Sequence, residues 1–177
     1  SADYEVTYGE NTNVGTGTVK VTLKGNYTGS KEISFTITAK AVATEDIEVS
    51  GVNASYEYTG TAINPSSLTV KADGKTLASA DYDVTYGENT KVGNGTVKVT
   101  LKGNYSGSKE VSFTITAKEL IATPVAGQNK VYGEADPTLQ VGVTGNVSGE
   151  TPGKTGALSR ADGQDVGTYA ITQGTLA

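Results

Sequence analysis

The chain has 177 residues, a formal net charge of −5, and no Cys, His, Met or Trp. Without Cys and His it has no residues for a disulfide framework, a thiolate metal site or a triad that uses histidine as its base. Its charges are interspersed and no apolar run reaches the ~18 residues of a membrane-spanning helix, so neither nucleic-acid binding nor membrane insertion is expected.

A duplication covers the first two thirds of the chain. Residues 1–40 align without a gap with residues 79–118, and 35 of the 40 positions are identical. The repeat unit is therefore 78 residues long, with one full copy at 41–118. We expect 1–40 to be the C-terminal half of a preceding copy, and 119–177 to be a different module.

In chain order, three segments of the first copy alternate apolar and polar residues, which predicts strands. Their apolar rows are Tyr4, Val6 and Tyr8; Val19, Val21 and Leu23; and Ile33, Phe35 and Ile37.

The second copy repeats these rows 78 residues later. It adds three upstream strand candidates at 46–51, 55–60 and 67–74, and turn sequences such as Asp-Gly and Gly-Asn-Tyr separate the segments. Short strands with one apolar face each predict an all-β chain of small tandem modules in an elongated array. The pattern leaves open whether each module is an Ig-like sandwich or a β-grasp-like arrangement.

Long motifs resemble known modules. The stretches "DYDVTYGENT", "VGNGTVKVTLKGNY" and "FTIT" resemble the tandem extracellular repeats of bacterial surface proteins of the Gram-positive type. From about 119 to 177, "KVYGEADPTLQVGVTG" and "GALSRADGQDVGTYAITQGTL" closely resemble the MBG domain of the YGX type. The resemblance implies spacer repeats at the cell surface or cell wall, with no catalytic activity, no cofactor and no binding residues to carry over.

Because residues 1–40 match only the second half of the repeat unit, we expect open apolar surfaces. A forty-residue half-module is too short to bury its own apolar row, and the resemblance implies that 119–177 lacks a last strand. We therefore expect a neighbouring part of a longer assembly to cover an inter-subunit packing face of six residues: Val19, Val21, Leu23, Ile33, Phe35 and Ile37.

Two arrangements would provide this cover. In the first, the half-module of one subunit completes the open C-terminal module of the next by strand exchange, which propagates head to tail as a fibre. In the second, the chain is a cut through a longer continuous array, whose adjacent repeats pack on one another.

Two motifs with closely spaced acidic and amide side chains are candidate cation sites. Asp162, Gln164 and Asp165 surround Gly163, but their spacing differs from that of the calcium loop of EF-hands, and a plain turn is favoured. The two "YGENT" motifs bring Glu10 and Asn11, and Glu88 and Asn89, close in sequence, and a polar hairpin turn explains them better. No metal site is predicted.

Tyrosines and lysines suggest two further chemistries. Tyr56 and Tyr58 near Asn or Asp could stack on a sugar, although core packing accounts for most of the tyrosines. A Lys–Asn amide cross-link needs an inward-pointing lysine, whereas four lysines alternate with the apolar rows and should point outwards: Lys20, Lys24, Lys98 and Lys102.

The sequence thus predicts a non-enzymatic structural repeat segment of a secreted or cell-surface bacterial protein, acting as a stalk or as the subunit of an extracellular filament. Its expected partners are copies of itself or adjacent repeats, head to tail. The alternative is an adhesive module that binds a glycan or a host protein.

Overall fold

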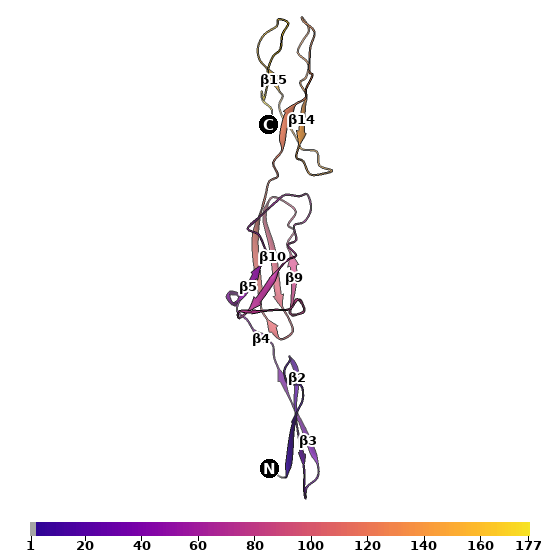
Figure 1. Cartoon of the computed structure of the whole chain (residues 1–177), viewed down its shortest axis with the longest axis vertical. Helices are drawn as coiled ribbons and strands as arrows, with labels where there is room; N and C mark the ends of the chain where they lie inside the picture. Colours follow the sequence, from indigo (N-terminus) through magenta and orange to yellow (C-terminus); the bar gives the residue numbers. More distant parts are fainter. Residues whose placement is uncertain (1–2) are drawn as a thin grey trace. The chain divides into compact units, whose positions relative to one another are not determined.

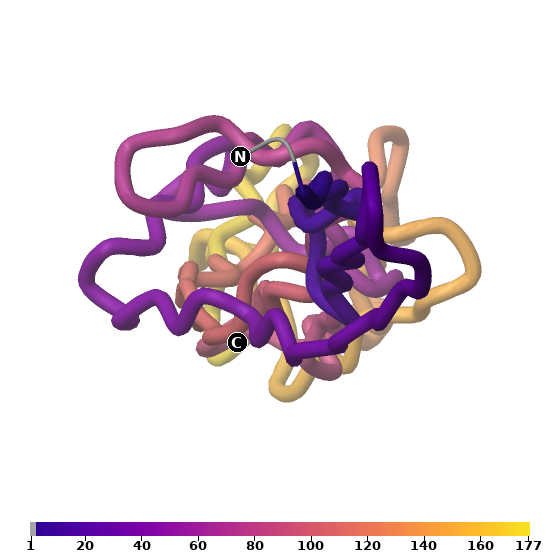
Figure 2. The backbone as a smooth tube through the Cα atoms, turned by 90° about the horizontal axis from the view of Figure 1, so that it is seen from below, coloured from indigo at the N-terminus to yellow at the C-terminus, as the bar shows by residue number. Residues whose placement is uncertain are grey.

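The computed structural model describes residues 3–177, and in that range every regular element is a β-strand or one turn of 3-10 helix. The predicted all-β fold class is therefore confirmed. Strands and open loops follow one another along the described chain (Figure 1), and Figure 2 traces the same backbone as a tube. Ser1 and Ala2, which begin the duplicated stretch, lie outside the described residues.

The first copy forms one antiparallel sheet in the order β1-β2-β3. Its strands are β1 (Tyr4–Tyr8), β2 (Gly15–Leu23) and β3 (Ser30–Ile37). Val19 lies opposite Tyr8 on one side and opposite Ile33 on the other. Because side chains alternate between faces, this register gathers the apolar rows on one face of the sheet.

The second copy forms the same sheet again. Strands β9 (Tyr82–Tyr86), β10 (Gly93–Leu101) and β12 (Ser108–Thr116) pair in the register of β1, β2 and β3, displaced by 78 residues. Strand β6 (Ser55–Glu57) joins the edge beside β12 and completes the order β6-β12-β10-β9.

A second sheet, in the order β5-β7-β8, consists of β5 (Ile47–Ser50), β7 (Thr69–Ala72) and β8 (Lys75–Thr76). The predicted Asp-Gly turn joins β7 to β8 through Asp73 (φ 47°) and Gly74 (φ 74°), the left-handed pair that two-residue hairpins require.

The two sheets of residues 41–118 share one core, which makes this module a β-sandwich. The sheet β5-β7-β8 and its flanking segments contribute Val42, Ile47, Val70, Ala72 and Leu77, and strand β10 contributes Val99 and Leu101. Single 3-10 turns, η1 (Thr44–Asp46) and η2 (Ser79–Asp81), precede β5 and β9.

The junction between the two copies is itself hydrogen-bonded. Strand β4 (Lys40–Ala41) pairs in parallel with β11 (Tyr105–Ser106), and Lys40 N–H donates to Asn104 C=O at 2.9 Å. The Asn104 side chain accepts from Val14 N–H at 2.8 Å and donates to the Asn13 side chain at 2.8 Å. The chain is thus tied to the second copy as it leaves the first.

The C-terminal residues form two separate two-stranded antiparallel sheets. Strand β13 (Ile121–Pro124) pairs with β14 (Val141–Thr144), and β15 (Ser159–Arg160) pairs with β16 (Ile171–Thr172).

By backbone contacts the chain divides into two compact units. The first contains 1–56 and 62–115, and the second contains 57–61 and 116–177. Among the described residues, every fully buried hydrophobic side chain lies between Val42 and Ile115, so the closed core belongs to the complete repeat in the first unit.

Candidate functional site

The six residues predicted to form a packing face do come together on one sheet. Val19, Val21 and Leu23 lie on β2, and Ile33, Phe35 and Ile37 lie on β3. Leu23 is 42% exposed, Phe35 45% and Ile33 60%, while the other three are half-buried. Tyr4 and Tyr8 of β1 extend the same face and are also exposed. The result is a contiguous apolar sheet face open to solvent.

A glycine beneath each phenylalanine sets the shape of this face. Gly17 lies opposite Phe35 in the register, and a Cβ added at Gly17 would overlap the Phe35 ring. Gly95 stands in the same relation to Phe113. The ring therefore lies flat over the neighbouring strand, which only a residue without a side chain permits.

The "YGENT" motif provides a structural asparagine. Asn89 is 5% exposed and is the buried polar residue among the described residues. Its side-chain amide donates to Ile63 C=O and to Thr96 C=O, both at 3.0 Å, and its side-chain oxygen accepts from Thr96 N–H at 2.9 Å. Asn11 makes the equivalent two bonds with Thr18, at 3.0 and 2.8 Å. The motif thus fastens a turn to the long strand of each sheet.

Two motifs of the C-terminal residues meet through the single arginine of the chain, Arg160. Its guanidinium donates from Nε and Nη2 to the Asp136 carboxylate at 3.0–3.1 Å. Its Nη1 donates to the carbonyls of Ala161 and Gly163, at 2.8 and 2.7 Å. The guanidinium also lies 5.0 Å from the centre of the Tyr169 ring, a cation–π distance. We call Arg160, Asp136, Lys130 and Tyr169 the arginine network.

Lys130 completes the charge balance of the arginine network, since its ammonium lies 2.8 Å from the Asp136 carboxylate. Hydrogen bonds from Lys130 and then from Arg160 lower the pKa of Asp136 below its ordinary value of 3.8, against the opposing effect of desolvation. The network therefore links "YGEADP" to "SRADGQDVGTY", the motif that contains the candidate cation residues Asp162 and Asp165.

The arginine network predicts a pH dependence with a definite sign. Because the pKa of Asp136 is depressed in the folded chain, the network stabilises fully above the unfolded value near 3.8. This contribution is lost as the pH falls below that value and through the folded pKa. Asp136→Asn should cause the same loosening at pH 7, seen as several-fold faster amide hydrogen exchange in 130–137 and 160–165.

The matched control is Glu134→Gln, which removes a nearby negative charge but leaves the contacts of Asp136 in place. It should leave exchange in these segments unchanged at pH 7. Equal effects of the two substitutions would show that net charge, and not the arginine network, holds these loops.

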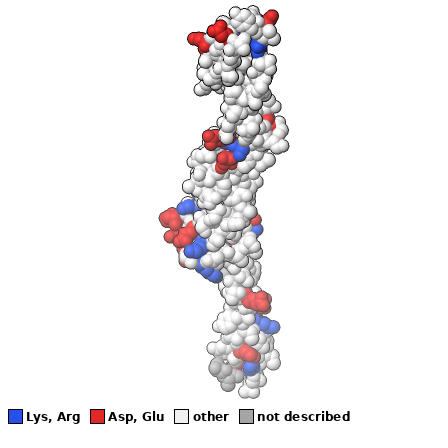
Figure 3. Space-filling model, turned by 45° about the horizontal axis from the view of Figure 1, so that its top comes forward, with Lys and Arg blue, Asp and Glu red and all other residues white. Residues whose placement is uncertain are grey.

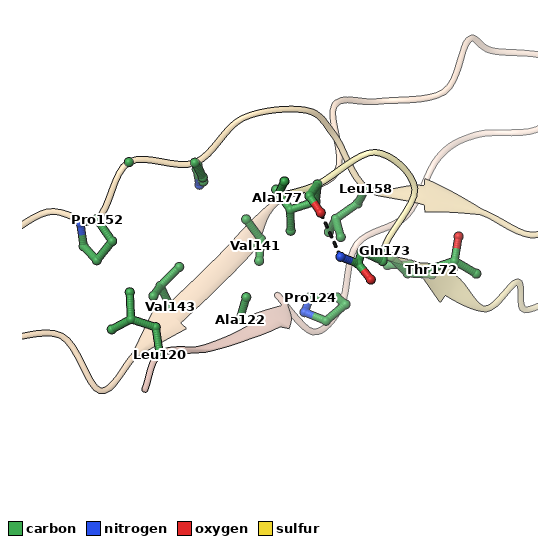
Figure 4. A pocket seen from close by; sticks show the side chains of 14 residues that line it. Leu120, Ala122, Pro124, Val141, Val143, Pro152, Leu158, Thr172, Gln173 and Ala177 are labelled. Atoms are coloured by element: carbon green, nitrogen blue, oxygen red, sulfur yellow. Dashed lines mark hydrogen bonds between the residues drawn. The ribbon is translucent and has the colours of Figure 1, made fainter. Parts of the chain in front are cut away.

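An apolar groove lies between the two C-terminal sheets. Its volume is about 510 Å³. Leu120, Ala122 and Val143 come from the side of β13 and β14, and Leu158 comes from the side of β15 (Figure 4). Ile171 of β16 also lines the groove. Each of these residues remains at least partly accessible to solvent. The second unit thus has apolar residues that face an open space.

The candidate tyrosines differ between the copies. Tyr4, Tyr8 and Tyr27 are exposed, whereas their counterparts Tyr82, Tyr86 and Tyr105 are half-buried. Tyr56 packs edge-on against Phe113, with ring centres 5.0 Å apart. The Tyr58 hydroxyl donates to Glu150, which raises the pKa of Tyr58 above its ordinary value. Tyr82 and Tyr105 pack against the core of the complete repeat.

The lysines that alternate with the apolar rows lie on the outer face. Lys24 pairs with Glu5 at 2.6 Å and Lys102 with Asp83 at 2.5 Å, both between exposed side chains. Acidic and basic groups lie close together on the face shown in Figure 3. Such exposed pairs add little stability individually, but they keep the outer face of each sheet polar.

Residues 3–177 contain neither a cluster of metal-ligating side chains nor a helix suited to cross a membrane. No group of three or more acidic side chains gathers there in the way a metal site requires. No helix in that range has the length and apolar character to cross a membrane.

Sequence reasoning missed the arginine network and the junction residue Asn104. A lone arginine, 24 positions after an aspartate in a chain otherwise rich in lysine, was the available signal for the first. Asn104 carried no signal, because its counterpart Asn26 has the same neighbours in sequence but different neighbours in space.

No curated protein matches the chain. A family model described as the MBG domain (YGX type) matches residues 113–177, which contain the arginine network and the apolar groove. This family is a repeat module of bacterial surface proteins and is structural rather than catalytic. The match begins at Phe113, within β12, and the expected resemblance is confirmed: the C-terminal part of the chain carries an MBG domain of the YGX type.

Proposed function

We propose that this chain is a structural repeat segment of a secreted or cell-surface bacterial protein, and that it works as part of a stalk. The observation that carries the proposal is the hydrogen-bonded junction between the two copies. Lys40 and Val42 donate backbone hydrogen bonds to Asn104 and Ser106, at 2.9 and 2.8 Å. A linker that is fixed in this way transmits tension between repeats and restricts hinge motion at the junction.

Two further features support a mechanical role. The complete repeat buries its apolar residues between two sheets whose long strands are held by a full antiparallel ladder. In an array of such units, stability is approximately the sum of the terms for each unit and for each interface between neighbours. The MBG match adds a family of surface repeat modules to the same chain.

Single-molecule force spectroscopy on the full chain, held at its two ends, tests this function. The repeat at 41–118 should unfold in one discrete step. At ~3.5 Å per extended residue, its 78 residues release about 27 nm, less the end-to-end distance of the folded repeat. Gradual lengthening without such a step would contradict a load-bearing role.

A filament form, completed by strand exchange, has separate support. The open face of β1-β2-β3 and the groove of the second unit are both apolar and solvent-accessible. If the face of one copy filled the groove of the next, sedimentation velocity would show a ladder of oligomers that grows with concentration. A single monomer boundary at every concentration would favour the stalk.

The adhesive alternative draws on a polar cavity of about 710 Å³ near the arginine network, lined among others by Tyr132, Asn129 and Gln164. Tyr132 is exposed, and an exposed tyrosine ring offers a flat surface for stacking on a sugar. Specific binding to a glycan array, lost in Tyr132→Ala, would favour this role.

A further inference from the structure

The two copies provide an internal comparison of one sheet with and without cover. Tyr4 pairs with Leu23 as Tyr82 pairs with Leu101, and the long strands follow the same register throughout. The sheets therefore present the same apolar face. Leu101 and Phe113 are 5% and 2% exposed, whereas the counterparts Leu23 and Phe35 are 42% and 45% exposed.

The cover of the second sheet is a contiguous segment, residues 41–78. It contributes the five apolar residues that share the core with Val99 and Leu101, and it places Tyr56 edge-on against Phe113. The segment also joins the sheet through β6, which lies along β12. The sheet β1-β2-β3 has the counterparts of all these contact positions, and β3 is an edge strand there.

Polar contacts fix how residues 41–78 lie on the second sheet. Thr114 N–H donates to Ala54 C=O at 3.0 Å, and the Tyr86 hydroxyl donates to Pro65 C=O at 2.6 Å. Ile63 exchanges two hydrogen bonds with Asn89, both at 3.0 Å.

The first sheet carries the same three groups as Thr36, Tyr8 and Asn11. Asn11 is already oriented by its two hydrogen bonds with Thr18, at 3.0 and 2.8 Å. The first sheet thus has both the apolar surface and a pre-oriented polar anchor for the same kind of segment.

We propose that the apolar face of β1-β2-β3 is the docking site for a second segment of the 41–78 type, supplied by an adjacent repeat. The proposal deepens, and rests on, the structural-repeat function proposed above. Exchange of residues 41–78 between two copies of this chain would uncover one sheet for each sheet it covers, so it yields no net burial. The occupant is therefore a segment that is not already packed on a sheet of its own.

The test adds a synthetic peptide of residues 41–78, with a fluorophore at its N-terminus, to the full chain. We expect saturable one-to-one binding, and slower amide exchange in Val19–Leu23 and in 30–37. Phe35→Asp should weaken binding at least about tenfold, and Ser34→Asp, on the opposite face of β3, should change it by less than about twofold.

Matched peptides keep the test valid if a substitution in the chain unfolds the first sheet. Val70 and Thr69 are neighbours in sequence, and in the complete repeat Val70 is buried and Thr69 is exposed. We expect the same pattern when the peptide is bound to the first sheet. Peptide Val70→Asp should fail to bind, while peptide Thr69→Asp should bind like the parent.

Three results would overturn the proposal: no binding, protection confined to 79–118 through displacement of the resident segment, or equal binding by both peptide variants. Self-association of the chain that protects 120–177 would also overturn it, in favour of the exchange between face and groove. Failure of peptide binding with a normal unfolding step under force would reject the docking site and leave the structural function standing.

Discussion

Phe113→Ala is expected to destabilise the complete repeat by about 3–5 kcal/mol, the usual cost of removing a buried phenylalanine side chain. Phe113 is 2% exposed, lies over Gly95 and packs against Tyr56. Removal of the buried ring leaves a cavity over Gly95, which has no side chain with which to fill it. Urea titration of the full chain, followed by the amide NMR signals of Val97–Leu101, measures this loss.

Phe35→Ala is the matched control, since Phe35 has the same sheet, register and underlying glycine. Because the Phe35 side chain is 45% exposed, its removal leaves no closed cavity. The cost should be about 1–2 kcal/mol, read from the amide signals of Val19–Leu23. Equal losses at the two positions in monomeric chain would mean that the first sheet is covered.

Asn89→Ala is expected to destabilise the complete repeat by about 2–4 kcal/mol. The substitution removes three side-chain hydrogen bonds and leaves the Thr96 N–H and the Ile63 carbonyl without this partner. The Thr96 carbonyl keeps its bond from Gly87 N–H at 3.1 Å. Buried backbone groups without a partner bear the desolvation penalty in full. The same urea titration reports the loss, and local exchange should rise first around Ile63.

Asn11→Ala provides the comparison for this asparagine. The Asn11 side chain bonds to Thr18 of β2, and the flanking turn residues are open to water. Water can replace the lost side chain there, so a cost of about 1 kcal/mol or less is expected. A larger effect at Asn11 than at Asn89 would contradict the role assigned to the covering segment.

Much of the fold follows from local sequence. The alternation in "TVKVTL" and "SFTIT" predicts strands, because one apolar face per strand must be buried against another sheet. Asp73 and Gly74 predict a hairpin because their left-handed conformations suit few other residues. The duplication predicts that β1-β2-β3 and β9-β10-β12 share one strand order and register, since near-identical strands carry the same alternation.

Other features depend on contacts between distant positions, which a single sequence does not encode visibly. Arg160 and Asp136 are separated by 24 positions, and their pairing depends on how two loops fold back towards each other. Asn104 and Asn26 have near-identical neighbours in sequence. Only Asn104 lies at the junction, because the path of the chain, and not the local motif, brings Val14 to it.

The central claim is that two near-identical sheets differ in whether a 41–78 segment covers them. Amide hydrogen exchange on dilute, monomeric full chain, compared between Val19–Leu23 and Val97–Leu101, tests this claim most directly. The account predicts amide hydrogen exchange at least about tenfold faster in the first sheet. Its strands open locally more easily, because no packed core covers their apolar face. Equal protection of the two sheets in the monomer would contradict it.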